Sequence, residues 1–112
     1  RSPIAVKVAG AAVARYSAEV ETAVYFCCLE ALQNAGKHAG DEASIDVRVW
    51  RDDQGLQFEV VDDGAGFVVG PHGAAGHGFV NMADRLGTIG GTLSVTSAPG
   101  AGTRIAGLIP MA

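Results

Sequence analysis

Residues 20–39 read VETAVYFCCLEALQNAGKHA, and this stretch decides how the rest of the chain is arranged. At 3.6 residues per turn it separates into two faces. The apolar face has the spacing of a stripe that packs on a core: Val20, Val24, Cys27, Ala31 and Ala35. The other face carries a carboxylate, a carboxamide, an ammonium and an imidazole: Glu30, Asn34, Lys37 and His38. A solvated helix face and a ligand-binding face are both open readings of this polar stripe on its own.

The segments around this helix predict the architecture. Alternating apolar residues indicate strands near residues 4–10, 45–50, 56–60, 92–96 and 103–109. Ser17 is a suitable N-cap for the long helix, and Gly40 is a suitable residue to end it. A second helix follows Gly78. The order strand, helix, hairpin, loop, helix, hairpin predicts an α+β fold, a mixed and mostly antiparallel sheet covered on one face by helices.

The composition limits the class of protein. The 112 residues are 48% hydrophobic and 18% charged, which is typical of a single globular domain. A net charge of −4 argues against a nucleic-acid partner, because phosphate backbones require a basic surface. No apolar run has membrane-spanning length, so we expect no membrane contact by this domain. The chain starts at Arg1 without an initiator Met, and we expect residues 1–112 to be one domain of a longer protein.

The two cysteines, Cys27 and Cys28, are adjacent within the long helix. A disulfide between neighbouring residues strains its own geometry, and two thiols without a nearby Cys/His cluster make a poor metal site. Reduced cysteines in a cytoplasmic protein are therefore the expectation.

Two glycine-containing motifs follow the hairpin. Residues 62–66 read Asp-Asp-Gly-Ala-Gly at a strand end, where a carboxylate accepts a hydrogen bond and glycines allow a ligand to approach the backbone. Residues 76–78 read Gly-His-Gly before a helix, an arrangement whose free N–H groups attract phosphate. Taken singly, the first motif is also an ordinary turn and the second an ordinary surface loop.

Together and in this order, the motifs resemble the ATP-binding domain of the GHKL superfamily, which folds as the Bergerat α/β sandwich. Residues 30–39 resemble its N box, residues 62–66 its first glycine box, and residues 76–78 its second. Gly102 and Thr103 resemble the Gly-Thr pair of its last strand. Within the superfamily, residues 25–39, 78–93 and 99–103 look like the sensor histidine kinases of the nitrate-sensor-like group. The resemblance covers nearly the whole chain.

The resemblance implies that the cofactors are ATP and Mg²⁺. Asn34 would ligate the Mg²⁺, and Glu30 would be the catalytic residue, near the metal-bound water or the reacting phosphoryl group. Lys37 and His38 would meet the phosphates, together with the backbone of Gly76, His77 and Gly78.

For the base, Asp62 would accept a hydrogen bond from the amino group of adenine, and Gly64 and Gly66 would leave room for the ring. Thr103 would support the same pocket. The implied reaction is transfer of the γ-phosphoryl group to a histidine on a dimerisation domain, followed by transfer to a response regulator.

The sequence departs from the family pattern at three positions. Leu29 stands where Gln is frequent, Phe26 where a basic residue is common, and Asp84 where Glu is frequent. We expect the phosphoacceptor helix to lie outside residues 1–112, since no His followed by an acid precedes the first strand in this sequence. The fragment is therefore expected to bind ATP without containing the histidine that receives the phosphoryl group.

Two alternatives share the same pocket. An anti-sigma-factor-type serine kinase would phosphorylate a serine on a partner protein, and a non-catalytic module would bind the nucleotide without transfer. A histidine-containing dimerisation helix in the parent protein would favour the sensor kinase over the serine kinase.

Overall fold

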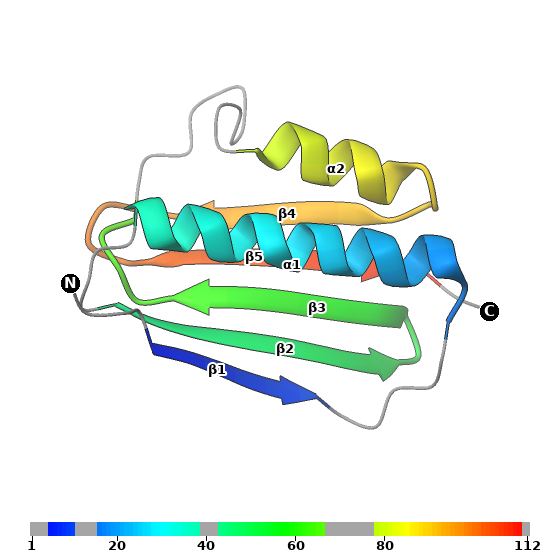
Figure 1. The fold of residues 1–112 in the computed structure, drawn as a ribbon, viewed down its shortest axis with the longest axis horizontal. Helices are drawn as coiled ribbons and strands as arrows, with labels where there is room; N and C mark the ends of the chain where they lie inside the picture. The colour runs from blue at the N-terminus through cyan, green and yellow to red at the C-terminus, as the bar shows by residue number, and fades with distance from the viewer. Residues whose placement is uncertain (1–4, 11–15, 39–42, 67–77, 111–112) are drawn as a thin grey trace.

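The structure is a computed structural model, and it describes residues 5–10, 16–38, 43–66 and 78–110. Within these ranges the chain forms two layers, a sheet and two helices packed on one of its faces (Figure 1). The elements are β1 (Ala5–Gly10), α1 (Ala18–His38), β2 (Ser44–Asp52), β3 (Gly55–Asp62), α2 (Phe79–Gly87), β4 (Thr92–Ser97) and β5 (Thr103–Ile109). The predicted α+β two-layer architecture is confirmed.

The sheet has the strand order β1-β2-β3-β5-β4. The edge strand β1 runs parallel to β2, and the other neighbouring pairs are antiparallel. The parallel pair is connected through α1, as parallel strands require a crossover. The predicted strands agree with the observed ones to within a few residues. The helix predicted from Ser17 begins at Ala18 and reaches His38, whereas its predicted end at Gly40 lies outside the described residues.

The core lies between the sheet and the helices. Phe58 on β3 is completely buried, and its ring occupies the place that a side chain on Gly107 of β5 would need. The buried line of α1 runs through Ala23, Cys27, Ala31 and Ala35.

This line differs at its start from the predicted stripe. Val20 and Val24 are only half-buried, and Ala23 lies in the core instead. Small side chains spaced four residues apart let the helix backbone approach the bulky residues of the sheet closely, and the larger valines pack at the margin.

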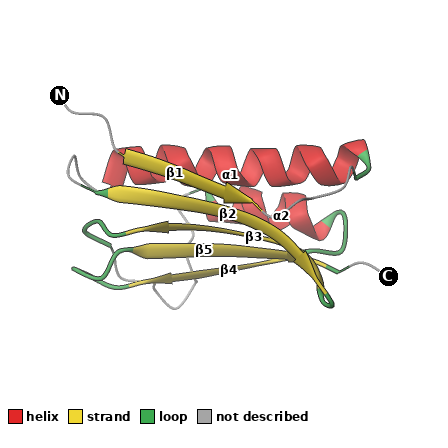
Figure 2. Cartoon of the chain, turned by 90° about the horizontal axis from the view of Figure 1, so that it is seen from below, coloured by secondary structure: helices red, strands yellow, loops and turns green. Residues whose placement is uncertain are grey.

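Within the described residues both helices lie on one face of the sheet and leave the other uncovered (Figure 2). That second face carries polar side chains, which include Arg48, Glu59 and Arg104, so two layers are enough. Glu59 on β3 is 8% exposed and accepts hydrogen bonds from Arg48 Nη1 at 3.1 Å and from Arg104 Nε at 2.9 Å. The Arg48 guanidinium also lies 5.5 Å from the centre of the Trp50 ring. Because both arginines are largely exposed, these ion pairs add little stability, but they keep this face compatible with water.

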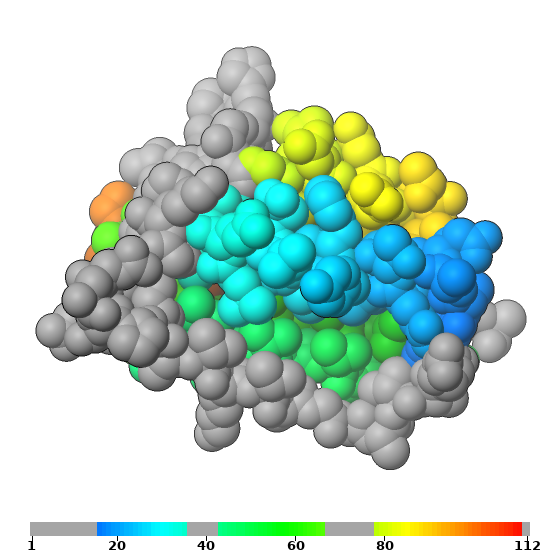
Figure 3. Space-filling model, in the orientation of Figure 1, coloured from blue at the N-terminus to red at the C-terminus, as the bar shows by residue number. Residues whose placement is uncertain are grey.

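The two helices are antiparallel and lie side by side over the sheet (Figure 3). Cys27 Sγ on α1 donates to the backbone oxygen of Met82 on α2 at 3.8 Å. The neighbouring Phe26 ring lies 4.6 Å from the guanidinium of Arg85, which is about one turn beyond Met82 on α2. These contacts hold the middle of α1 against α2, and because the two helices are antiparallel, the C-terminal half of α1 lies toward the start of α2, which brings two of the predicted motifs together.

Candidate functional site

The ends of two helices and two strands lie at one end of the sandwich, at the left of Figure 1. They are the C-terminal ends of α1 and β3 and the N-terminal ends of α2 and β5. The predicted site residues are distributed over these ends, although they are separated by up to seventy-three positions in the sequence (Glu30 to Thr103). The antiparallel arrangement of β3 and β5 and of α1 and α2 is what collects them.

Glu30 and Asn34 lie one turn apart on α1, and both are half-buried. They face the start of α2: a Cβ added at Gly78 would lie 2.7 Å from Glu30 Oε2 and 4.0 Å from Asn34 Nδ2. Gly78 has φ +78°, a left-handed backbone conformation that favours glycine. The N box and the second glycine box are therefore in contact through these three residues.

The start of α2 has the features of an anion site. Gly78 occupies the N-cap position without a side-chain capping bond in the described part of the chain, and no acidic residue lies in the first turn. The first backbone N–H groups of a helix have no partner within the helix, and the helix dipole makes this end positive. These groups point to the end of the molecule at which Glu30 and Asn34 lie.

Asp62 and Thr103 form the other half of the site. They are direct partners on β3 and β5, on the face covered by the helices, and are 8% and 9% exposed. Asp62 Oδ1 accepts from the backbone N–H of Gly64 at 2.9 Å, and within the described ranges its second carboxylate oxygen remains for another donor. Asp63 is used differently: its Oδ1 accepts from the Ser44 N–H at 2.7 Å, which ties the strand end to β2.

The first glycine box packs on the turn between β4 and β5. A Cβ at Gly66, which has φ +68°, would collide with the backbone oxygens of Ala98 and Gly102. The Gly100 N–H donates to the Ala65 oxygen at 2.6 Å. Gly66 thus has a structural requirement of its own, in addition to the room for a base that the resemblance implies.

A small cavity of about 180 Å³ borders this end of the sheet, and Asp62, Ser97 and Thr103 are among its lining residues. Ser97 did not figure among the sequence-based candidates. The strand pattern contained the signal, because Leu93 and Val95 face the helices and a period of two places Ser97 on the same apolar face. A hydroxyl on this otherwise apolar face indicates a hydrogen-bond partner there.

The remaining predicted residues lie beyond what the structure describes. Lys37 and His38 belong to the last turn of α1, but their side chains are outside the described part, as are Gly76 and His77. Among the described residues, no group of three His, Cys, Asp or Glu side chains could hold a metal ion. A Mg²⁺ bound mainly by phosphate and water needs few protein ligands, and the Asn34 amide beside Glu30 suits that kind of site.

Both cysteines are free thiols. Burial raises the pKa of Cys27 to about 12 and that of Cys28 to about 11, so both remain protonated at neutral pH. Protonated thiols are poor nucleophiles and poor metal ligands, which agrees with the structural role predicted for them.

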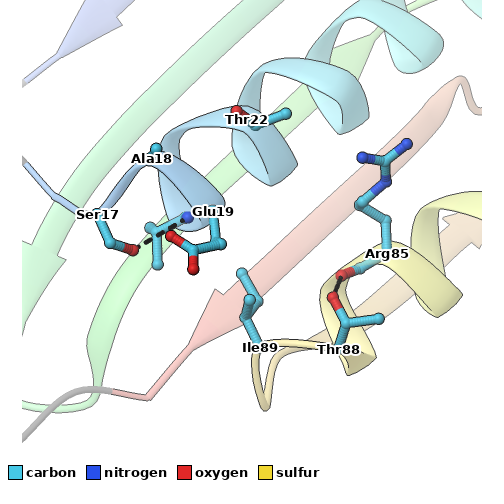
Figure 4. A pocket seen from close by; sticks show the side chains of 8 residues that line it. Ser17, Ala18, Glu19, Thr22, Arg85, Thr88 and Ile89 are labelled. Carbon is cyan, nitrogen blue, oxygen red and sulfur yellow. Dashed lines mark hydrogen bonds between the residues drawn. The ribbon is translucent and has the colours of Figure 1, made fainter.

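A larger groove of about 720 Å³ lies at the opposite end, between the start of α1 and the end of α2 (Figure 4). Its lining residues include Glu19, Arg85 and Ile89. None of the predicted nucleotide contacts that the structure describes belongs to it. The position of the candidate site therefore follows from the convergence of polar groups and not from the size of the hollow.

Residues 19–112 match the family model described as "Histidine kinase-, DNA gyrase B-, and HSP90-like ATPase". The chain belongs to this family. It is 35% identical over 96 residues to the sensor histidine kinase MctS of Rhizobium johnstonii, a match that spans 83% of the chain and 20% of MctS. It is 35% identical over 83 residues to the signal transduction histidine-protein kinase/phosphatase UhpB of Salmonella typhimurium, spanning 74% of the chain and 16% of UhpB. The chain therefore spans about a fifth of the length of these relatives.

Solved structures agree with the family. The histidine kinase domain of the blue-light activated histidine kinase from Erythrobacter litoralis superposes with a TM-score of 0.74 at 27% identity, covering 98% of this chain and 52% of that one. The catalytic domain of the histidine kinase ThkA gives 0.75 at 15% identity, which supports the fold alone. The described part of this family member contains no helix long and apolar enough to cross a membrane.

Proposed function

We propose that this chain is the catalytic domain of a sensor histidine kinase, which binds ATP with Mg²⁺ and transfers the γ-phosphoryl group to a histidine on a separate dimerisation domain. The observation that carries the proposal is the contact of Glu30 and Asn34 with Gly78, at the same end of the sheet as Asp62 and Thr103. The relatives named above, a sensor histidine kinase and a signal transduction histidine-protein kinase/phosphatase, support it.

In this proposal the two polar residues of α1 serve the phosphates. When bound, Mg²⁺ would neutralise phosphate charge and orient the transferred group. Asn34 would supply an amide oxygen to the metal, an oxygen ligand of the kind that Mg²⁺ prefers. Glu30, one turn earlier, would hold a metal-bound water or accept the proton of the incoming histidine.

The start of α2 would bind the phosphates through its backbone. Its first N–H groups and its positive dipole end favour an anion. Gly78 allows the helix to begin directly beside Glu30 without a side chain in between. Gly76 and His77, which precede it, together with Lys37 and His38, would complete the phosphate contacts.

The end of the sheet would bind the base. Asp62 would accept from the adenine amino group with its second oxygen, and Thr103 on the neighbouring strand would line the same pocket. Gly64 holds the Asp62 carboxylate from one side, and this fixes its orientation toward the cavity.

Isothermal titration of the 112-residue chain tests the binding step. ATP and ADP are titrated with and without Mg²⁺. We expect saturable binding of one nucleotide, tighter with Mg²⁺. Binding of neither nucleotide under any of these conditions would refute the proposal.

The transfer step needs the dimerisation domain of the parent protein. With that domain restored, incubation with labelled ATP is expected to produce an acid-labile phosphohistidine. An acid-stable phosphoserine on an added partner would favour the serine-kinase alternative, and nucleotide binding without any transfer would favour the non-catalytic one. A response regulator would then receive the phosphoryl group from this histidine. Among sensor histidine kinases, we propose that the chain belongs to the nitrate-sensor-like subgroup.

We also propose a cytoplasmic location for the domain. Two free, protonated thiols are compatible with a reducing compartment, and ATP is the substrate proposed for this site.

A further inference from the structure

Three hydroxyl or carboxylate side chains form one row across three strands. Ser97 on β4 is the direct partner of Thr103 on β5, and Thr103 is the direct partner of Asp62 on β3. Directly paired residues point to the same face of a sheet, in this case the face covered by the helices. All three residues line the cavity at the end of the sheet.

The protons in this row can be assigned from its contacts. Ser97 Oγ donates its one hydroxyl proton to the backbone oxygen of Gly102, at 2.8 Å. Thr103 Oγ1 lies 2.9 Å from Ser97 Oγ, and one of these two atoms must be the donor. Because the Ser97 proton is already directed to Gly102, the Thr103 hydroxyl supplies the proton of this bond.

This assignment leaves Thr103 and Asp62 with only acceptor atoms to offer a ligand. Thr103 Oγ1 keeps its lone pairs, but its proton is held by Ser97. Asp62 is a carboxylate, which accepts only, and one of its oxygens is taken by the Gly64 N–H. A ligand that meets both side chains must therefore bring hydrogen-bond donors.

We infer that Ser97 is a positioning residue. By holding the Thr103 proton it leaves Thr103 and Asp62 with only hydrogen-bond acceptors for the base, so that the pocket selects a purine with a 6-amino group over one with a 6-oxo group. The 6-amino group of adenine carries two N–H donors, one for each of the two acceptors, whereas hypoxanthine has a 6-oxo oxygen at that place and only its N1–H to donate beside it, so that one of the acceptors Thr103 and Asp62 would face the oxygen unpaired. This inference rests on the proposed function, because it concerns the base of the nucleotide bound there.

A bridging water does not change the outcome. A water that donates to both Thr103 Oγ1 and Asp62 has spent both of its protons, and it presents only lone pairs to the ligand. The base would again have to donate. The selection therefore holds for direct and for water-mediated contacts.

The test compares ATP with inosine triphosphate, which differs from ATP only in carrying a 6-oxo group and a proton on N1. Both are titrated with Mg²⁺ into the 112-residue chain and into Ser97→Ala. The wild-type chain is expected to prefer ATP. Ser97→Ala releases the Thr103 hydroxyl to rotate and donate, so the ratio of the two affinities should narrow by roughly three- to tenfold, about the effect of one hydrogen bond.

Two further variants serve as matched controls. Ser97→Thr keeps a hydroxyl at the position and should keep the wild-type ratio. Ser94→Ala removes a serine from the same strand but from its exposed opposite face, and it should leave both affinities unchanged. Asp62→Asn is the positive control, since its amide can donate to a 6-oxo group and should shift the preference toward inosine triphosphate.

The outcomes separate this inference from the proposed function. If Ser97→Ala weakens both nucleotides equally, Ser97 only holds the β4–β5 turn and the inference is overturned. Equal wild-type affinities for both nucleotides would overturn it as well, while leaving ATP binding intact. If the wild-type chain binds neither nucleotide, the proposed function fails and the inference fails with it.

Should Ser97→Ala fail to fold, as judged by its thermal melt, Thr103→Val replaces it. This variant removes the acceptor itself and should narrow the ratio by a similar factor. An unchanged ratio in Thr103→Val overturns the inference.

Discussion

The two helices begin in opposite ways. At the start of α1, the Ser17 hydroxyl accepts from the Val20 N–H at 3.3 Å, and Glu19 and Glu21 lie in the first turn. At the start of α2, Gly78 offers no side chain, and the first turn has no acidic residue. Both ends have the same positive dipole, but the Ser17 side chain caps the start of α1, whereas no side-chain cap within the described residues covers the start of α2, where we propose that phosphate binds.

The capped start of α1 and the uncapped start of α2 also lie at opposite ends of the molecule. The capped end lies beside the larger groove, at the right of Figure 1, and the uncapped end lies beside Glu30, Asn34 and the ends of β3 and β5. A change at the capped end should alter stability, whereas a change at the uncapped end should alter nucleotide binding.

The largest effect is expected for Gly78→Ala. An alanine in the left-handed conformation costs about 1–2 kcal/mol, and its Cβ would displace Glu30, so ATP affinity should fall by about tenfold or more. Calorimetric titration measures the loss. Gly87→Ala at the other end of α2 is the matched control, because a Cβ there meets nothing within 4 Å; unchanged affinity in both variants would contradict the proposed phosphate site.

Asn34→Ala should remove the effect of the metal rather than the effect of the base. Without the amide oxygen, the ratio of ATP affinities with and without Mg²⁺ should fall to about one. The neighbouring Gln33→Ala, at an exposed position of the same helix, should keep the wild-type ratio. If Asn34→Ala retains the full Mg²⁺ dependence, another residue is the ligand.

At the capped end, Ser17→Ala should lower the free energy of unfolding by about 1 kcal/mol, since it removes a helix N-cap. ATP affinity should stay unchanged, because the cap lies at the opposite end of α1. Urea denaturation followed by circular dichroism measures the first quantity and titration the second. A loss of affinity without a loss of stability would show that the two ends are not separate in the way we describe.

Asn81→Asp is expected to have the smallest effect and to make the start of α2 resemble that of α1. An acid in the first turn should stabilise the helix by about 0.3–1 kcal/mol, while its charge repels phosphate and weakens ATP binding slightly. The loss of affinity should shrink as salt is added, because an exposed charge is screened. Tighter ATP binding in this variant would contradict an anion site at the helix start.

Much of the fold could be predicted from local patterns. The strands follow from alternation, as in Leu56, Phe58 and Val60, and the long helix follows from its spacing and from Ser17. The prediction of the buried line of α1 was less accurate, because Ala23 and Val24 are both apolar and periodicity alone does not decide which of them faces the sheet.

Part of the candidate site could likewise be predicted from the sequence, and part could not. Residue types and spacing were enough to suggest Glu30, Asn34 and Asp62, because a mid-helix Asn and an acid at a strand end before glycines each indicate a site. Thr103 was suggested by the family resemblance alone. Ser97 was missed, although its position on that face was visible, since its role depends on a partner in another strand.

The sequence by itself therefore determined the elements, the order of the motifs and the chemistry that each could offer. Only the tertiary structure decided which of these groups meet. The antiparallel helices place Gly78 against Glu30, and the pairing of β3, β5 and β4 aligns Asp62, Thr103 and Ser97. The physical reason is that local propensity acts over a few residues, whereas the direction of a proton between two hydroxyls depends on atoms that only packing brings within 3 Å.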